Sequence, residues 1–582
     1  AILAQAAQVN RSVFIAMPWW SSPLSSPLPS WLAGDGEVLP LYAFIRAGFR
    51  LATFIFYGNI TRDGHAANVP PVGVPGLICF NHMNGLADPM VMMPTCPRMI
   101  RFLAMDTLWK KPIIASLVRA SAAVPLQRAV DHGANADNHS TQVGVLKAWD
   151  DGHLVAVSPE GGSMMRTMLH KPFKRGYLYW LVDALFDHWD DDGFRVCVLP
   201  CGLTFLHPWS WRSEVLVRYG QPLYVDARFL RRHGATPEMS RSSPKNADRL
   251  ACAQRCVGEL VGHLETAMAE VVANVPPPPA PTEAQRVEGD WAALRRGIVA
   301  GRVCHPERAE LSLRAWVGVV QHLAKELQRP EHQALAADVC RHQRHLSRAG
   351  MREEQLSKLS HDGRPSSLVV VSEMALRALQ GIVYISLSLP GALCWSPLWL
   401  LCIFAERHFV AKGRKLEDGR FTRRGINFDL IACTKMLLGF VTLTLECITS
   451  GACMTVWLMD SQGLTVGVSV AMGLFAACVM TPGLLWIALR LCQAGLAIFR
   501  RARALLALQR VDARTLEDLV SERSRLCSLL EKLGSSNAQQ MTRAESLADS
   551  KLPCGWLRRR QADWHESFSQ EDLTWHGLAD ED

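Results

Sequence analysis

Three long apolar segments near the C-terminal end most strongly constrain what this chain can fold into. Residues 381–405 and 461–489 contain no charged side chain, and residues 430–459 contain only Lys435 and Glu446. About 20 apolar residues in a helix cross the ~30 Å hydrocarbon core of a bilayer. One such segment could be a helix buried in a large soluble core. Three in close succession favour helices that enter a membrane.

Positive charge flanks these segments and predicts their orientation. Residues 406–424 carry seven Lys or Arg against three acids, and Arg500, Arg501 and Arg503 follow the last apolar segment. Cytoplasmic loops are enriched in Lys and Arg, so both basic segments should face the cytoplasm. Residues 430–459 and 461–489 then form a membrane hairpin, and residues 381–405 enter and return on one side. Pro390 and Pro397 would permit such a re-entrant bend.

A fourth apolar segment, residues 41–57, contains Arg46 and Arg50 on one helical face. Two central arginines disfavour a crossing of the bilayer. We expect an interfacial helix whose arginines reach lipid phosphates.

Residues 69–276 alternate short β-rich segments with helical patterns. Expected strands cover residues 76–80, 154–158, 196–200, 203–206 and 215–219, with a helix at 178–188. This alternation predicts an α/β domain, a mixed sheet flanked by helices, followed by C-terminal transmembrane helices. Within it, residues 228–249 are rich in Arg, Ser and Pro, which predicts a surface loop.

The predicted organisation has five parts. They are an N-terminal segment (1–68), the α/β domain (69–276), a Pro-rich linker with a charged helical region (277–380), the membrane region (381–499) and a cytosolic tail (500–582). The linker is marked by five prolines within residues 275–281. No motif indicates a chemical role for residues 283–380.

Composition excludes several classes of protein. The net charge of +8, from 62 basic and 54 acidic residues, is too small and too dispersed for a nucleic-acid binder, although it suits a membrane surface or phosphorylated substrates. Seventeen cysteines include no Cys-x-x-Cys pair, so no zinc ribbon is indicated and no metal is expected. Neither a Gly-x-Gly-x-x-Gly nor a Gly-x4-Gly-Lys-Ser/Thr sequence occurs, so the sequence does not support a nucleotide-binding loop of either type.

Two clusters could carry chemistry. In the first, His82 follows the strand at 76–80, and Asp88 comes six residues later. On a turn that opens a helix, Asp88 could fix the imidazole tautomer and leave the other nitrogen free to take a proton. A turn histidine beside an ordinary Asp-Pro helix boundary explains this segment equally well.

The second cluster, residues 157–166, follows the strand at 154–158. Gly161 and Gly162 would let the backbone approach a ligand closely. The basic residues downstream would help to bind a phosphate; they are Arg166, Lys171, Lys174 and Arg175. Alone, a Pro-Glu-Gly-Gly turn is weakly specific.

Taken together, four blocks occur in order: residues 81–89, residues 124–128, residues 159–163 and residues 198–200. This order resembles the glycerolipid acyltransferases, the PlsC-like superfamily. The sequence is most similar to the fungal-type glycerol-3-phosphate/dihydroxyacetone-phosphate acyltransferases, in the extra residue between His82 and Asp88 and in the stretch from Pro159 to Thr167. Ser158, where the family usually has an aromatic residue, departs from the pattern.

The resemblance implies roles for the matching residues. His82 would be the general base that deprotonates the acceptor hydroxyl, and Asp88 would orient it. The predicted substrate-binding residues are Asn84, Arg128, Glu160, Gly161, Gly162, Ser163, Arg166, Lys174 and Pro200. Because a carboxylate repels phosphate, Glu160 would hold a hydroxyl or an arginine. No cofactor is expected beyond acyl-CoA as co-substrate.

The resemblance thus implies an acyl-CoA-dependent O-acyltransferase that acylates the sn-1 hydroxyl of glycerol 3-phosphate in phospholipid and triacylglycerol synthesis. One alternative is acylation of lysophosphatidate at sn-2. Another is a catalytically silent membrane scaffold that binds lipid. The expected location is the endoplasmic-reticulum membrane, with the catalytic domain facing the cytosol. Expected partners are acyl-CoA, glycerol 3-phosphate and membrane lipids, and no nucleic acid.

Overall fold

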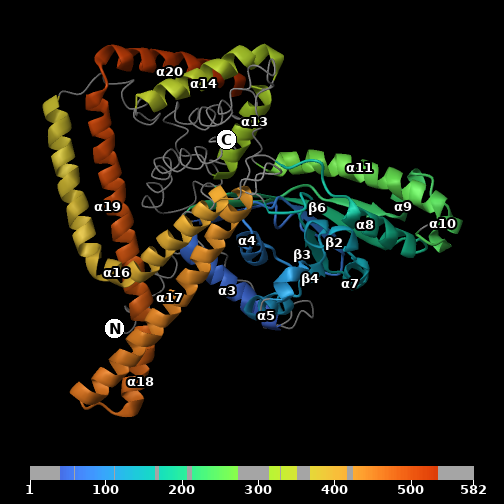
Figure 1. The fold of residues 1–582 in the computed structure, drawn as a ribbon, viewed down its shortest axis with the longest axis horizontal. Coiled ribbons are helices and arrows are strands. Elements are labelled where there is room, and N and C mark those ends of the chain that lie inside the picture. Colours follow the sequence, from blue (N-terminus) through green and yellow to red (C-terminus); the bar gives the residue numbers. More distant parts are fainter. Residues whose placement is uncertain are drawn as a thin grey trace, which may run out of the picture.

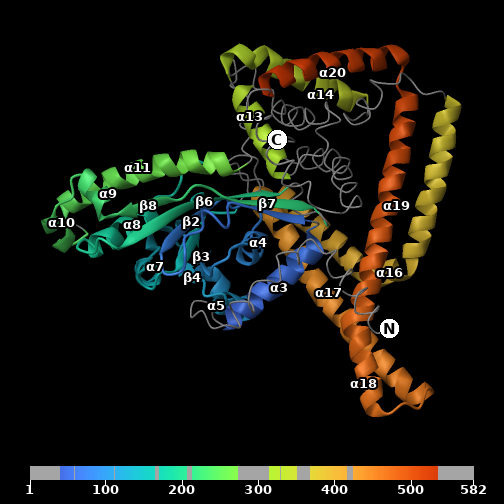
Figure 2. The same cartoon turned by 180° about the vertical axis from the view of Figure 1, so that it is seen from behind.

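The computed structural model describes residues 40–57, 59–110, 112–163, 169–205, 211, 213–244, 246–272, 313–327, 329–349, 367–415 and 424–534. Most of the predicted N-terminal segment, the Pro-rich linker and the end of the tail lie outside these residues. In Figures 1 and 2, an α/β domain lies on one side of the molecule and a group of long helices lies on the other.

The α/β domain is built on an eight-stranded mixed sheet in the order β1-β7-β6-β2-β5-β3-β4, with β8 also paired to β6. The four strands β2, β5, β3 and β4 are parallel neighbours, and β6 is parallel to β2. β7 and β8 run antiparallel to β6. The strands are β1 Asn59–Asp63, β2 Gly76–Phe80, β3 Ile100–Met105, β4 Val124–Leu126, β5 Leu154–Val157, β6 Arg195–Phe205, β7 Glu214–Tyr219 and β8 Leu223–Asp226.

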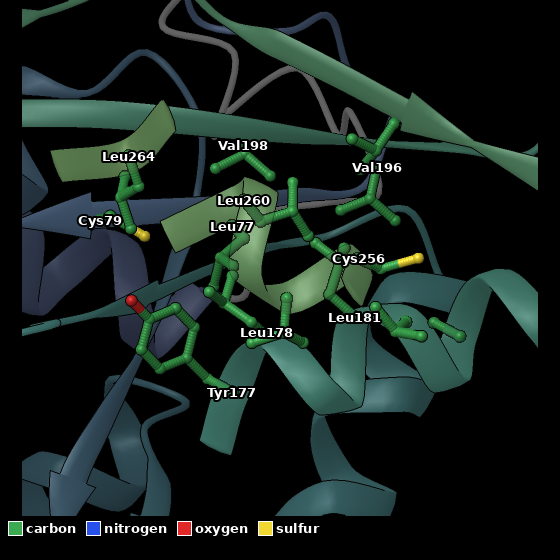
Figure 3. Close-up of a cluster of buried hydrophobic side chains, with 14 of the residues drawn as sticks. Leu77, Cys79, Tyr177, Leu178, Leu181, Val196, Val198, Cys256, Leu260 and Leu264 are labelled. Carbon is green, nitrogen blue, oxygen red and sulfur yellow. The ribbon is translucent and has the colours of Figure 1, made fainter. Parts of the chain in front are cut away.

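Side chains alternate across β2 and supply two separate cores. Leu77 and Cys79 point into the first core with side chains of α7 (His139–Asp150), α8 (Gly176–Asp187) and α11 (Ala247–Val271). Figure 3 shows this core, in which Leu178 and Leu260 meet the sheet residues Val196 and Val198. Ile78 and Phe80 point to the opposite face, which α3 (Pro40–Phe56) and α4 (Ala87–Thr95) cover. The sheet is therefore covered on both faces, as expected for a largely parallel sheet.

The predicted fold class is confirmed, with two local corrections. The strands predicted at 196–200 and 203–206 form the single strand β6. Pro200 pairs with Cys79 of β2, and on the opposite edge of β6 it falls between the part that pairs with β8 and the part that pairs with β7. The loop predicted at 228–249 instead contains the helices α9 (Ala227–Arg232) and α10 (Pro237–Arg241) and the start of α11. Asp226 and Asn246 cap α9 and α11 through their side-chain oxygens.

Three helical segments are long and apolar enough to cross a membrane, by length and composition: Met374–His408, Ile431–Ser461 and Val466–Leu496. They belong to α16 (Ser367–Lys415), to α17 (Arg424–Ser461), and to α18 (Val466–Phe475) with α19 (Thr481–Arg510). A turn joins Ser461 to Val466, where the sequence predicts the hairpin, and the crossing of a bilayer by these helices stays a prediction. α16 is one helix that contains Pro390 and Pro397, and Figures 1 and 2 show that it bends sharply. Its re-entrant path through a bilayer stays a prediction.

The long helices and the α/β domain share contacts. α3 packs against α17 as well as α4, and Phe54 of α3 stacks on Trp486 of α19 at 5.4 Å between ring centroids. Beyond them, α13 (Leu313–Glu326) and α14 (Gln333–Arg348) pack against α20 (Ala513–Gly534). Residues 41–57 thus include a helix that packs against the sheet, α17 and α19, and their interfacial position at a membrane stays a prediction.

Candidate active site

Two neighbouring parallel strands bring the two chemical clusters together. Cys79 of β2 pairs with Val157 of β5, so both strands end at the same edge of the sheet. The loop with His82 follows β2, and the turn with Glu160 follows β5. Ligands of open α/β sheets bind beyond the carboxyl ends of the strands. This edge is therefore the candidate active site.

His82 and Asp88 form a close pair there. Nδ1 of His82 lies 2.7 Å from Oδ2 of Asp88, which is fully buried in the first turn of α4, whereas the His82 side chain is 22% exposed. The same carboxylate oxygen accepts hydrogen bonds from the backbone N–H groups of Met83 at 2.9 Å and Asn84 at 3.0 Å. We infer that Nδ1 carries the proton, so Nε2 keeps a lone pair that can accept one from a hydroxyl.

Neighbouring strands and loops hold this loop in place. The Asn81 side chain makes two hydrogen bonds to the Leu203 backbone of β6, at 2.9 Å and 2.7 Å. On the other side, the Gly85 backbone N–H donates to the Ser163 hydroxyl at 2.8 Å. Ser163 thus links the turn after β5 directly to the His82 loop.

Glu160 is buried next to His82. Its side chain accepts hydrogen bonds from the backbone N–H groups of His170 and His82, which favour the charged form. Burial outweighs them and raises the pKa of Glu160 to about 7. A carboxyl group in this environment can exchange a proton near neutral pH, whereas an exposed glutamate stays ionised.

The turn around Gly161 requires glycine and carries Lys174 beside it. Gly161 has a φ of +78°, and a Cβ atom there would lie 2.9 Å from Cγ and Cε of Lys174. The Lys174 backbone N–H donates to the Pro159 carbonyl at 2.7 Å. The aliphatic part of this exposed lysine therefore packs on the turn, and the turn gains a nearby positive charge.

Other predicted site residues lie apart from this cluster. Arg128 follows β4. Because β4 lies three strands from β2, the two strands are about 14 Å apart across the sheet. Nε of Arg128 donates to Asp131 at 2.7 Å. Pro200 is buried within β6 opposite Cys79, about 10 Å along the strand direction from His82. Arg166 lies outside the described residues. The roles given to all three stay predictions.

Asn84 and Gly162 complete the predicted set. Asn84 is buried, and its side chain donates to the Tyr57 hydroxyl at 3.3 Å. Gly162 stands in the open turn between Gly161 and Ser163, where a Cβ atom would meet nothing within 4 Å. No sequence signal points to Tyr57, because residues 41–57 show only an apolar pattern with two arginines. The His170 backbone N–H, which donates to Glu160, is likewise marked by no sequence signal.

Two family models match the chain. Residues 62–204 match the family described as Acyltransferase, and residues 299–540 match the Glycerol-3-phosphate acyltransferase 2 C-terminal domain. The first includes His82, Asp88 and Glu160, and the second includes all three apolar helices. The chain therefore carries an acyltransferase domain followed by a C-terminal domain of the second type, which confirms the resemblance seen in the sequence.

Individual relatives agree with this assignment. Glycerol-3-phosphate O-acyltransferase 2 of Saccharomyces cerevisiae is 25% identical over 309 residues, which cover 52% of this chain and 36% of that protein. Glycerol-3-phosphate O-acyltransferase 1 of the same yeast is 31% identical over 91 residues, or 16% of this chain and 11% of that protein. The chain thus spans about a third or less of the length of these curated relatives.

A solved structure is also similar. It is the 1-acyl-sn-glycerophosphate acyltransferase PlsC of Thermotoga maritima, with 18% identity and a TM-score of 0.25 over 38% of this chain and 79% of that chain.

Proposed function

We propose that this chain, with its acyltransferase domain and membrane helices, is an acyl-CoA-dependent glycerol-3-phosphate O-acyltransferase. It transfers a fatty acyl group to the sn-1 hydroxyl of glycerol 3-phosphate and releases lysophosphatidate and CoA. One observation carries the proposal: Nδ1 of His82 lies 2.7 Å from Oδ2 of Asp88 at the carboxyl end of β2. The names of the yeast relatives support the choice of acceptor.

The proposed mechanism needs no covalent enzyme intermediate. Nε2 of His82 takes the proton of the acceptor hydroxyl as the oxygen attacks the thioester carbonyl carbon. The C–O bond forms, the C–S bond breaks, and the CoA sulfur leaves with the proton returned by the imidazolium. Asp88 holds the imidazole and stabilises its positive charge. A positioned base of this kind contributes about 10²–10⁴-fold in rate, and alignment of the two substrates adds to it.

Acceptor binding is assigned to the turn after β5. Lys174 supplies positive charge beside Gly161, and Ser163 and Glu160 offer groups that can hydrogen-bond the acceptor's hydroxyls. Arg166 continues the same segment, and we include it with Arg128 as phosphate ligands. Pro200 would shape the acyl-CoA side through β6. The reaction uses acyl-CoA as co-substrate and neither a metal nor another cofactor.

We propose an integral membrane location in the endoplasmic reticulum, with the acyltransferase domain on the cytosolic side. Residues 406–424 and the three arginines after residue 499 would face the cytosol. Acyl-CoA is a soluble thioester with a lipid chain, so a site at the membrane surface suits both substrates.

The test is an assay of the full chain in membranes of a host strain that lacks glycerol-3-phosphate acyltransferase activity. Labelled glycerol 3-phosphate with acyl-CoA should give lysophosphatidate. Product from lysophosphatidate alone would assign the sn-2 reaction instead. No product from either acceptor, with the protein present in the membrane, would leave a silent lipid-binding scaffold as the explanation.

A further inference from the structure

Tyr57 lies directly behind the catalytic loop. It follows the last turn of α3, and its side chain is fully buried. The hydroxyl accepts a hydrogen bond from the Asn84 side chain at 3.3 Å. The ring packs edge-on to Phe56 and at an angle to Phe205 of β6, with centroid separations of 4.9 Å and 5.7 Å. Two aromatic contacts therefore hold the ring, and a hydrogen bond holds the hydroxyl.

The partner of this hydroxyl belongs to the catalytic loop. Asn84 donates its backbone N–H to Oδ2 of Asp88, the atom that also contacts Nδ1 of His82. The buried Asn84 thus contacts Tyr57 through its side chain and Asp88 through its backbone. A shift of Tyr57 would displace Asn84, and with it one of the donors that orient the carboxylate.

The first turns of α17 lie close to Tyr57. Ala432 and Met436, in the first membrane turns of α17, are buried in the same hydrophobic core as Tyr57. The pKa of Tyr57 is raised well above its usual value, first by burial and then by the negative charge of Asp88, with a smaller contribution from the nearby Cys433 thiol of α17. Figure 2 shows α3 beside α17, and these helices are in contact. Tyr57 therefore lies between α17 and the catalytic loop.

We propose that Tyr57 is a positioning residue for acyl transfer, holding Asn84 and hence the His82–Asp88 pair in place against the first turns of α17. This inference rests on the proposed function. It means that the membrane hairpin helps to set the geometry of the base, in addition to anchoring the domain. Tyr57 itself does not touch the reacting atoms.

Tyr57→Phe in the full chain tests the hydroxyl, and Tyr42→Phe is the matched control. Tyr42 is another fully buried tyrosine of the α3 segment, and its hydroxyl accepts from the Ile100 backbone at 2.9 Å, away from the catalytic loop. We expect kcat to fall about 10- to 100-fold in Tyr57→Phe with both KM values within about twofold. The acidic limb of the pH profile should move to lower pH, because a loosened Asp88 stabilises the imidazolium less. Tyr42→Phe should retain the wild-type kcat and pH profile.

A second pair of variants tests the contact from the membrane side. Cys433→Ala removes the α17 thiol near Tyr57, and Cys402→Ala removes a similarly buried thiol on α16. We expect a severalfold loss of kcat in Cys433→Ala and no loss in Cys402→Ala. If Tyr57→Phe does not accumulate in the membrane, these two cysteine variants test the inference in its place. Unchanged kcat in Tyr57→Phe, or equal losses in variant and control, would overturn the inference while wild-type activity stands. An inactive wild-type chain would instead overturn the proposed function.

Discussion

The imidazole of His82 and the carboxylate of Asp88 meet at 2.7 Å although one side chain comes from the loop after β2 and the other from the first turn of α4. Two backbone N–H groups of the intervening loop bind the same carboxylate oxygen as His82. The loop therefore wraps around Asp88. The six-residue spacing from His82 to Asp88 gives the loop enough length to do so.

Replacement of either member of the pair should abolish most of the activity. His82→Ala removes the base, and we expect a rate loss of about 10²–10⁴-fold or more. Asp88→Asn would present an N–H to the imidazole and favour the tautomer with the proton on Nε2, so a similar loss is expected. The measurement is acyl transfer at equal protein abundance in membranes. His139→Ala, on an exposed residue, is the control, and turnover by His82→Ala would remove His82 as the base.

Glu160 should make the stability of the protein depend on pH. The pKa of Glu160 is raised from 4.5 to about 7 in the folded state, so the unfolded state loses this proton first as the pH increases. Stability from this group is therefore complete below about pH 4.5 and is lost as the pH rises to about 7. The rise in pKa corresponds to about 3 kcal/mol.

Glu160→Gln should remove this dependence. In detergent, the thermal midpoint of the variant should increase relative to wild type between pH 5 and pH 8, and the two proteins should be closest at pH 5. Glu517→Gln, at an exposed position on α20, is the control and should leave the pH dependence unchanged. Parallel curves for wild type and Glu160→Gln would show that Glu160 is ionised throughout this range.

The turn that follows β5 should not tolerate a side chain at Gly161. Gly161→Ala places a Cβ atom against Lys174 at a φ of +78°. We expect a destabilisation of about 1–2 kcal/mol and a raised KM for the acceptor, because Lys174 must move. Gly176→Ala, where a Cβ atom would meet nothing within 4 Å, is the control. Wild-type stability and KM in Gly161→Ala would contradict this account of the turn.

The sequence allowed the main elements of the site to be predicted for a simple physical reason. Strand β2, the turn after it and the Asp-Pro start of α4 are all local features, so the approach of His82 to Asp88 follows from short-range geometry. The approach of Glu160 depends on the pairing of β2 with β5. The ordered motif blocks indicated this pairing only through the family resemblance.

Two of the missed features depend on long-range packing, and the third depends on local helix caps. Tyr57 reaches Asn84 because α3 crosses the sheet face beside α17, and no pattern within residues 41–57 reports this. The continuity of β6 through Pro200 follows from a change of partner strand, which is likewise invisible in the local sequence. Residues 228–249 look like a loop by composition, but the caps at Asp226 and Asn246 begin helices there.

The hairpin turn should lie across the membrane from the acyltransferase domain. An epitope inserted between Gln462 and Gly463 should resist added protease in sealed vesicles whose cytosolic face is outside, and should be cut after detergent is added. An epitope between Asp191 and Asp192, in an exposed turn of the α/β domain, should be cut in both conditions. Cleavage of the first epitope without detergent would rule out the predicted hairpin.

An ion pair joins α16 to α17 near the end of the apolar segments. Nζ of Lys435 lies 2.6 Å from Oε2 of Glu406, and the Lys435 side chain is only 7% exposed, whereas that of Glu406 is 40% exposed. Glu406→Gln removes this carboxylate from a buried ammonium group, while Lys435→Met leaves a carboxylate whose side chain is 40% exposed. Glu406→Gln should therefore be more destabilising than Lys435→Met, by up to the ~3–5 kcal/mol typical of a broken buried pair.

The double variant tests whether the pair, and not the size of either side chain, causes the effect. Glu406→Gln with Lys435→Met removes both charges of the pair, so its thermal midpoint in detergent should recover most of the loss seen in Glu406→Gln. α16 and α17 pack near Trp211 and the C-terminal end of α3. Acyl transfer by the double variant should therefore recover together with its stability. Additive losses in the double variant would show that the two charges act independently.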